Sequence, residues 1–238
     1  MTNSKTALIT GSNRGIGKAT ASFFAQRGWN VIAHARKKND EFEMYLWSLK
    51  NQYHVDAMPI YFDMCDADEM KKQITEVIFK PKIKIDALIN NAGVCAIKLF
   101  LLSSMADIRK TFDVNLFSHM RLTQLILKRM DESSAIVNVA SIDGLEPKRG
   151  ESAYATSKAA LIAWTEVLRQ ELVGRIRVNA VAPHAVNTDM ARGIENQAVW
   201  KGSQIMEAQD IAKVIYFLCS DDAKAITGEV CKITGTIV

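Results

Sequence analysis

The first 28 residues constrain the fold of this chain more than any other stretch. Thr6 to Thr10 is a short apolar run typical of a buried strand, and Gly11-Ser-Asn-Arg-Gly15-Ile-Gly17 follows it at once. A helical pattern then runs to about Arg27 and stops at Gly28. Glycines at such a turn let the backbone approach a pyrophosphate, and the helix N-terminus supplies amide donors. The stretch therefore predicts a dinucleotide-binding unit, the alternative being a glycine-rich turn without a ligand.

The rest of the chain alternates between strand and helix patterns. We expect further strands at about 31–35, 57–62, 86–90, 135–140, 176–181 and 229–233, and helices at about 40–53, 67–79, 105–130, 152–173 and 208–220. No linker, repeat or low-complexity tract interrupts the alternation. The pattern predicts an α/β fold in one domain over residues 1–238: a doubly wound Rossmann-type fold, with a mostly parallel seven-stranded sheet and helices on both faces.

Composition and charge are those of an ordinary soluble globular chain. Of the 238 residues, 48% are apolar and 24% are charged, and the formal net charge is +4. This charge is far from a nucleic-acid signature, and no apolar run approaches the length of a membrane span. The residues before Thr6 leave no room for a secretory signal. Four scattered cysteines form no metal-binding spacing and indicate a reducing compartment. We therefore expect a cytoplasmic protein with no metal, no membrane segment and no nucleic-acid partner.

The end of the second expected strand indicates which cofactor the turn would bind. In dinucleotide-binding sheets an acidic residue near this point takes the ribose 2′-hydroxyl, whereas an arginine suits a 2′-phosphate. Here Ala35 offers no carboxylate, Arg36 follows directly, and Arg14 can approach from within the glycine turn. These residues predict NADP (NADPH) as the cofactor, the alternative being two solvated arginines.

Tyr154 and Lys158 lie four residues apart on the helix expected from Ser152. Side chains at this spacing share a helix face. An ammonium beside a phenol lowers its pKa and makes it a usable general acid or base. Alone, the pair is more often an ordinary surface Tyr and Lys. Asn115, in the middle of another helical pattern, is unfavourable there and can bend the hydrogen-bond ladder, which suggests a function.

Taken together, these motifs resemble the short-chain dehydrogenase/reductase family. They are Thr10-Gly11-x-x-x-Gly15-x-Gly17, Asn90-Asn91-Ala92-Gly93, Asn115, Ser141, Tyr154, Lys158 and Ile226-Thr227-Gly228. The resemblance covers essentially the whole chain in order and spacing, and it is nearest to the 3-oxoacyl-carrier-protein reductases.

The resemblance implies a catalytic set of four residues. Ser141 would hydrogen-bond the substrate carbonyl, and Tyr154 would donate a proton as hydride arrives from the nicotinamide. Lys158 would lower the pKa of the tyrosine and bind the nicotinamide ribose. Asn115 would hold a water that links Lys158 to solvent.

The resemblance also implies a cofactor-binding set. Asp63 would face the adenine, Asn90 would lie along the cofactor, and Arg14 and Arg36 would take the 2′-phosphate. The complete expected set is Gly11, Ser12, Asn13, Arg14, Gly15, Ile16, Gly17, Arg36, Asp63, Asn90, Ala92, Gly93, Tyr154, Lys158, Pro183, Val186 and Thr188.

Several positions depart from the family pattern. Pro183-His184 stands where Pro-Gly is usual, and the segment 186–206, where a substrate lid is expected, looks short. His184 is either a pocket group or a residue tolerated at a turn, and we favour the turn. Arg129 and Arg169 lie on helices where the carrier-protein reductases present basic residues to an acidic carrier. The departures leave the chemistry intact but weaken any transfer of substrate identity.

The sequence thus predicts an NADPH-dependent carbonyl reductase that also works as an alcohol dehydrogenase. A 3-oxoacyl group, possibly carrier-protein-linked, is the leading substrate, and a ketosugar or other small polar ketone is the alternative. A non-catalytic NADP-sensing regulator is the alternative from another class. The helix from Ser152 to about Val173 is apolar on more than one side. This predicts a homo-oligomer, tetramer or dimer, unless neighbouring elements of the same chain bury the helix.

Overall fold

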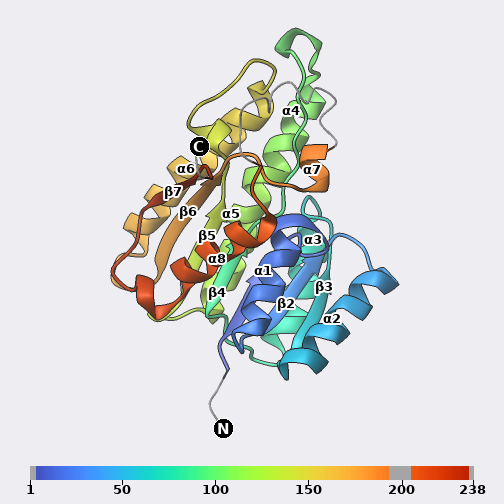
Figure 1. The fold of residues 1–238 in the computed structure, drawn as a ribbon, viewed down its shortest axis with the longest axis vertical. Helices are drawn as coiled ribbons and strands as arrows, with labels where there is room; N and C mark the ends of the chain where they lie inside the picture. Colours follow the sequence, from blue (N-terminus) through green and yellow to red (C-terminus); the bar gives the residue numbers. More distant parts are fainter. Residues whose placement is uncertain (1–3, 193–204, 236–238) are drawn as a thin grey trace.

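A single parallel sheet forms the centre of the molecule, as expected from the sequence (Figure 1). The computed structural model describes residues 4–192 and 205–235. The described strands are β1 (Thr6–Ile9), β2 (Asn30–Ala35), β3 (Ala57–Tyr61), β4 (Ala87–Asn90), β5 (Ala135–Val139), β6 (Arg177–Pro183) and β7 (Val230–Ile233). Their order in the sheet is β3-β2-β1-β4-β5-β6-β7, and every pairing is parallel. The prediction of a seven-stranded, doubly wound sheet is confirmed.

Helices cover both faces of this sheet. They are α1 (Gly15–Gln26), α2 (Asp40–Tyr53), α3 (Ala67–Ile74), α4 (Met105–Phe112), α5 (Ser118–Ile126), α6 (Ser152–Glu171), α7 (Asp189–Arg192) and α8 (Ala208–Cys219). Helices α1, α2 and α8 share one apolar core with the sheet, and α3, α5 and α6 share another on the opposite face. Side chains cap several starts: Asn39 accepts from the backbone N–H of Phe42 before α2, and Asp66 accepts from that of Glu69 before α3.

The central strands are buried on both faces, which explains why they read as continuous apolar runs. In β1, Ile9 packs in the core with α1, while its neighbour Leu8 packs in the core with α3 and α5. Leu8 pairs in register with Ile32 of β2 and with Leu88 of β4. Alternate residues of one strand thus hold opposite helical layers.

A π-helical turn interrupts the long helical pattern predicted over 105–130. The turn spans Asp113–Phe117, between α4 and α5, and contains the buried Asn115. The expectation that an asparagine here distorts the hydrogen-bond ladder is confirmed. A second π-helical turn, Thr75–Phe79, follows α3 inside the helix predicted over 67–79. Such turns are rare and frequently lie at functional sites.

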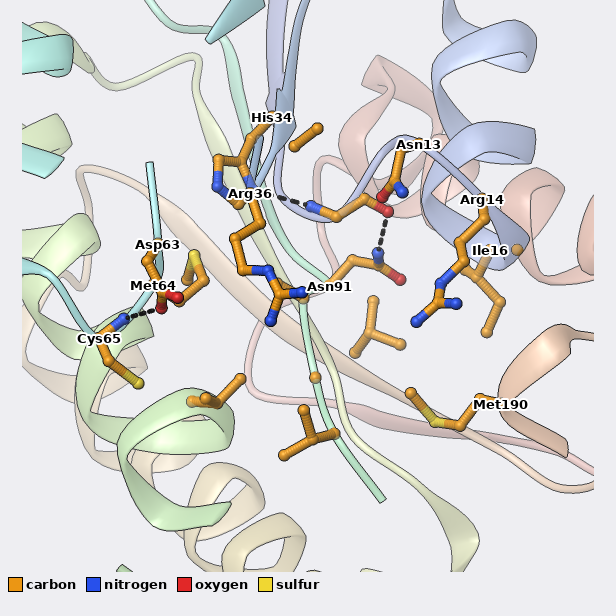
Figure 2. Close-up of a pocket in the computed structure, with 18 of the residues that line it drawn as sticks. Asn13, Arg14, Ile16, His34, Arg36, Asp63, Met64, Cys65, Asn91 and Met190 are labelled. Atoms are coloured by element: carbon orange, nitrogen blue, oxygen red, sulfur yellow. Dashed lines mark hydrogen bonds between the residues drawn. The ribbon is translucent and has the colours of Figure 1, made fainter. Parts of the chain in front are cut away.

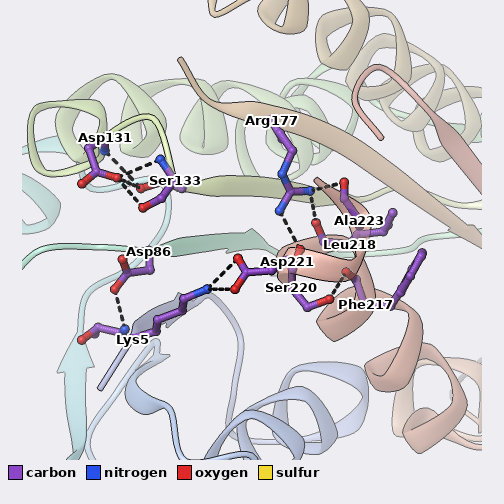
Figure 3. A network of polar contacts seen from close by, with 12 residues as sticks. Lys5, Asp86, Asp131, Ser133, Arg177, Phe217, Leu218, Ser220, Asp221 and Ala223 are labelled. Carbon is purple, nitrogen blue, oxygen red and sulfur yellow. Dashed lines mark hydrogen bonds and ion pairs between the residues drawn. The ribbon is translucent and has the colours of Figure 1, made fainter. Parts of the chain in front are cut away.

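Polar groups close the amino edge of the sheet (Figure 3). Arg177, at the start of β6, donates to the carbonyls of Leu218, Ser220 and Ala223 near the end of α8. Lys5 forms an ion pair with Asp221 at 2.9 Å. By donating to these carbonyls, the guanidinium fixes the end of α8 and the turn that follows it. This edge is fixed by structural contacts, so the ligand site is expected at the opposite, carboxyl edge.

The strand order reverses direction between β1 and β4, because β2 lies on one side of β1 and β4 lies on the other. In open α/β sheets, ligands bind at the carboxyl ends of the strands beside such a reversal. No helix in the described parts of the chain is long and apolar enough to span a bilayer.

Candidate active site

A cavity of about 810 Å³ opens at the carboxyl edge of the sheet, beside the reversal in strand order (Figure 2). This volume lies within the range of small-molecule and cofactor sites. Its wall combines the glycine turn, the ends of β2 and β3, the loop after β4, helix α4 with its π turn, and helix α6. The described residues that line it are 11, 13–16, 34–37, 39, 63–65, 91–94, 106, 109–110, 113–114, 139–140, 154, 158 and 188–190.

The glycine turn has a geometry that only glycine allows. Gly11 and Gly15 have backbone φ angles of +67° and +53°, in the left-handed region. A Cβ atom on Gly17 would stand 2.1 Å from the carbonyl oxygen of Gly11. The turn therefore keeps bare backbone against the cavity at the start of α1, where a pyrophosphate fits.

Two polar side chains outside the predicted set hold this turn. Asn91 Nδ2 donates to the carbonyl of Thr10 at 2.7 Å, while Thr10 Oγ1 accepts from the backbone N–H of Asn91 at 2.8 Å and of Ala92 at 2.9 Å. Ser12, placed in the predicted set, donates its hydroxyl to the carbonyl of Ile9 at 2.7 Å. Its side chain is fully buried, so it shapes the turn.

His34 is the second feature that sequence reasoning missed. Its Nδ1 accepts from the backbone N–H of Gly11 at 3.1 Å, and its Nε2 bonds to the carbonyl of Phe62 at 2.8 Å. A carbonyl only accepts, so Nε2 carries the proton and the ring is neutral. Burial lowers the pKa of His34 to about 4. His34 therefore ties the glycine turn to the end of β3. The sequence feature that could have revealed this role is a histidine inside an otherwise apolar strand.

The predicted cations lie on the cavity wall. Figure 2 shows the guanidinium groups of Arg14 and Arg36 directed into the cavity from two different elements. Ala35, beside Arg36, has no side-chain charge. Asp63 also lines the cavity, and its carboxylate accepts from the backbone N–H of Cys65 at 2.9 Å. These residues fit a phosphorylated adenosine: the guanidinium groups suit a phosphate, and the carboxylate suits a group with N–H donors.

Asn90 lies elsewhere than expected, because its side chain points away from the cavity. It is fully buried and donates to Thr123 Oγ1 at 3.1 Å and to Asn138 Oδ1 at 2.8 Å. Neighbouring residues of a strand face opposite sides, so Asn91 faces the cavity and Asn90 faces α5. The side chain of Asn90 thus joins β4 to β5 and α5.

The segment after β6 is partly described. Pro183 and Val186 are buried, and Thr188 reaches the cavity wall, where its Cγ2 would lie 3.2 Å from a Cβ on Gly15. Val186 pairs with Met206, so the two ends of the expected lid meet. Residues 193–204 of that lid lie outside the described residues.

Helix α6 places Tyr154 and Lys158 at the inner end of the cavity. Lys158 Nζ lies 5.9 Å from the Tyr154 ring centre and donates to the carbonyl of Val139 at 2.7 Å. Gly93 lies beside this ammonium, since a Cβ on Gly93 would be in ordinary van der Waals contact with Nζ, at 3.6 Å.

Asn115 joins the loop after β4 to α6. Its Oδ1 accepts from the backbone N–H of Val94 at 2.8 Å, and its Nδ2 donates to the carbonyl of Val94 at 3.0 Å and to Ser157 Oγ at 3.0 Å. The side chain therefore positions Gly93 and Val94 beside Lys158. Its expected part in a water chain stays a prediction.

Burial sets the protonation of the central pair. It raises the pKa of Tyr154, and the charges of Cys95, Asp143 and Glu151 act in the same direction, whereas the Ser141 hydroxyl acts in the opposite one. Burial also lowers the pKa of Lys158 to about 8. The sequence predicted a lowered pKa for Tyr154, whereas in the structure this pKa is raised. The reason is that desolvation opposes the charged form of both groups, and the ammonium is directed to Val139. Tyr154 therefore holds its proton at neutral pH.

Ser141 follows β5 and donates its hydroxyl to Asp143 Oδ2 at 3.1 Å. Asp143 in turn lies 3.4 Å from Lys148 Nζ. His184 is half-buried, and burial lowers its pKa, with the charge of Lys148 acting in the same direction and those of Asp143 and Glu146 in the opposite one. This histidine therefore lies near the loop after Ser141, where a substrate pocket is expected.

The arginines considered for carrier docking are already engaged. Arg129 donates to the carbonyl of Phe79 at 3.1 Å and lies over its ring, and Arg169 pairs with Glu166. These contacts weaken the inference that the two guanidinium groups are presented to an acidic partner.

The fold and this site define an oxidoreductase of the short-chain dehydrogenase type. The short-chain dehydrogenase family matches residues 5–198, so the chain belongs to that family. A 3-oxoacyl-[acyl-carrier-protein] reductase of Thermotoga maritima is 35% identical over 243 residues, covering 98% of each chain. The predicted family and the likeness to these reductases are confirmed.

Solved structures agree with the assignment. A short-chain dehydrogenase from Burkholderia cenocepacia in complex with NADP has a TM-score of 0.90 at 30% identity, covering 98% of this chain and 97% of that one. A 3-ketoacyl-(acyl-carrier-protein) reductase from Brucella melitensis complexed with NADH has a TM-score of 0.88 at 26% identity, covering 97% of each chain. Nicotinamide dinucleotides are thus bound by close structural neighbours.

Proposed function

We propose that the protein is an NADPH-dependent carbonyl reductase that also oxidises the corresponding alcohol. One observation supports this most: a single cavity runs from the glycine turn and the two arginines to Tyr154 and Lys158. A phosphate-binding end and a proton-donating end in one cavity suit hydride transfer from a phosphorylated dinucleotide. The NADP complex of the Burkholderia neighbour also supports the cofactor.

The chain's own residues would then perform the protonation. The bound dihydronicotinamide supplies the hydride. Ser141 orients the substrate carbonyl, and Tyr154 gives its proton to the oxygen as negative charge develops there. Lys158, about one helical turn further along α6, holds the ribose and stabilises the phenolate that remains. Because burial raises the pKa of Tyr154, the phenol stays protonated until it transfers its proton to the carbonyl oxygen.

The leading substrate is a 3-oxoacyl group, possibly on a carrier protein. The likeness to carrier-protein reductases supports this substrate. Arg129 and Arg169 add little support, because both guanidinium groups already make contacts within the chain. A small polar ketone is the second candidate. It is favoured by the charged groups Asp143 and Lys148 beside Ser141, because polar substrates use such groups as hydrogen-bond partners.

A non-catalytic regulator is the weaker alternative. Lys158 is 4% exposed and has a lowered pKa, so keeping its charge inside the protein costs stability. Such a cost is typical of functional sites. Catalysis accounts for it directly, whereas dinucleotide sensing alone has no need of the Tyr154 hydroxyl.

We also propose a homo-oligomer, a tetramer or dimer, in the cytoplasm. The outer face of α4, the π turn, α5 and α6 carries an apolar cluster that is only partly covered. It comprises Phe112, Met120, Ile162 and Trp164, together with Phe117, whose ring lies 6.3 Å from that of Phe112. Phe117 is 49% exposed, and a patch of this kind suits a subunit interface. The four free cysteines suit a reducing compartment.

NADPH oxidation over a ketone panel tests the function. The panel contains a short 3-oxoacyl thioester, free and carrier-linked, with several ketosugars. We expect turnover of at least one class, with NADPH preferred to NADH. No turnover of any member by a protein that binds NADPH would contradict the enzyme proposal and favour the regulator.

A further inference from the structure

His119 is a fully buried histidine that the mechanism above does not use. It lies in the first turn of α5, where its Nε2 bonds to the backbone carbonyl of Ala92 at 2.7 Å. A carbonyl only accepts, so Nε2 carries the proton and donates it. The other ring nitrogen, Nδ1, is buried and bonds to no described residue. Within the described chain, the bond to Ala92 is therefore the only hydrogen bond that the ring makes.

The ring of His119 is uncharged. Burial lowers the pKa of His119 to about 3, and the charges of Lys158 and His34 act in the same direction, against the bond to Ala92. At physiological pH the ring is therefore neutral. It serves as a hydrogen-bond donor and not as an acid or a base.

Two side chains from consecutive turns hold the loop that follows β4. Asn115, in the π turn Asp113–Phe117, bonds to both backbone groups of Val94. His119, four residues further along the chain, bonds to the carbonyl of Ala92. Both side chains are fully buried, so water does not compete for these bonds. The residues on either side of Gly93 are thus fixed to the helical layer by direct hydrogen bonds.

Gly93 lies between these two anchors and differs from them. It lines the cavity, and its backbone N–H and carbonyl bond to no described residue. A Cβ on Gly93 would lie 3.6 Å from Lys158 Nζ, so this part of the loop stands beside the catalytic ammonium. A Cβ on Gly11 would lie 3.1 Å from Ala92 Cα, so the preceding residue touches the glycine turn. The peptide groups of Gly93 are therefore placed to bind the nicotinamide half of a dinucleotide.

We propose that His119 is a positioning residue that fixes Gly93 beside Lys158, so that both bind the nicotinamide ribose of the cofactor. This role rests on the proposed function, because it needs a dinucleotide in the cavity. A loop without the bond to His119 can move away from Lys158, whereas the glycine turn keeps hydrogen bonds of its own. Loss of the bond should therefore weaken the hold on the nicotinamide half and spare the adenosine half.

The first test compares two ligands of different reach. NADPH fills both halves of the cavity, whereas adenosine 2′,5′-bisphosphate fills only the adenosine half. His119→Phe keeps an aromatic ring and removes the donor. In this variant NADPH should bind roughly three- to tenfold more weakly, and the bisphosphate should bind as it does to wild type. Calorimetric titration measures both affinities. Equal losses for the two ligands, or no loss for either, would overturn the proposal.

Rescue by a conservative variant separates positioning from packing. His119→Gln removes the ring but keeps a side-chain N–H that can donate to Ala92, so its NADPH affinity should return toward that of wild type. His119→Leu, which also lacks a donor, takes the place of His119→Phe if that variant fails to fold, with the same expected result. A glutamine variant that binds NADPH as weakly as the variant without a donor would overturn the proposal.

The matched control is Thr123→Val on the same helix. Thr123 is buried, and its Oγ1 accepts from Asn90 Nδ2 at 3.1 Å. The substitution therefore removes a buried hydrogen bond from α5 without touching the loop after β4. Both ligands should bind as they do to wild type, even where the free energy of unfolding falls. A loss confined to NADPH in this variant would show that any weakening of α5 has the same effect, and would overturn the proposal.

These titrations need no carbonyl substrate, so they separate this proposal from the proposed function. A selective loss of NADPH affinity in His119→Phe, with recovery in His119→Gln, supports the positioning role even if wild type reduces no member of the ketone panel. Only the proposed reductase activity would then be contradicted. A wild type that reduces a ketone, with NADPH affinity unchanged in His119→Phe, would contradict the positioning role alone.

Discussion

The Lys158 ammonium lies 5.9 Å from the centre of the Tyr154 ring, yet it donates its hydrogen bond to Val139. Burial acts on both groups of the pair: it lowers the pKa of Lys158 to about 8 and raises that of Tyr154. In each case the charged form has lost water and is disfavoured. The pair therefore rests with the proton on the tyrosine, which is the form that reduction of a carbonyl requires.

Lys158→Met should stabilise the ligand-free protein at neutral pH. The folded pKa, about 8, lies below the ordinary value of 10.5, so the unfolded chain binds this proton more tightly. The stability cost of burying the Lys158 ammonium is complete below about pH 8 and disappears as the pH rises toward 10.5. The free energy of unfolding should rise by about 1–3 kcal/mol at pH 7, a range that allows for the lost hydrogen bond to Val139. This gain should shrink above pH 8. Urea unfolding from pH 7 to 10 measures it, and a gain that grows with pH would contradict the assignment.

His34 should make the protein sensitive to acid. Its folded pKa, about 4, is below the ordinary 6.5, so stability falls as pH decreases through this window. The loss should reach about 3 kcal/mol by pH 4. In His34→Asn the slope of unfolding free energy against pH should be shallower between these limits. His54→Asn, at an exposed helix end, is the control, and an unchanged slope in His34→Asn would refute the role.

Arg36→Ala should weaken NADPH binding and spare NADH. A guanidinium on a phosphate is among the stronger charge-assisted contacts, so we expect a loss of roughly 1.5–3 kcal/mol for NADPH alone. Lys38→Ala is the control, because Lys38 is exposed and lies 3.8 Å from Glu43. Fluorescence titration with both dinucleotides measures the affinities. If wild type binds NADH as tightly as NADPH, the cofactor proposal is wrong.

Phe117→Glu should disrupt the oligomer. A carboxylate on this half-exposed apolar surface would be buried without a partner in an interface. Met44→Glu on α2 is the control, because Met44 is exposed outside the cluster. Light scattering at micromolar concentration should show an oligomer for wild type and for Met44→Glu. A wild-type mass of 26.5 kDa would rule the proposal out.

Most of the fold could be predicted because parallel sheets have a simple sequence pattern. Strands such as β1 are short apolar runs, and glycine turns mark where helices begin. A distortion of the helix at Asn115 could also be predicted, because asparagine disfavours a regular helix, although its form as a π turn could not.

The missed features depend on atoms far apart in the sequence. His34 matters because Gly11 and Phe62 lie on either side of its ring. The choice between Asn90 and Asn91 depends on which strand face meets the cavity. Burial, which sets the direction of the Tyr154 pKa shift, is a property of the packed structure and is absent from the Tyr-x-x-x-Lys spacing.

The central claim is that Tyr154 is the proton donor, and Tyr154→Phe tests it most directly. The ring and its packing remain, so the variant should bind NADPH as wild type does. Turnover of a confirmed ketone substrate should fall by ~10²–10⁴-fold or more, because general acid catalysis is lost. The decisive measurement is the single-turnover rate of NADPH oxidation at saturating cofactor, compared between the variant and wild type. A rate equal to that of wild type would contradict the mechanism.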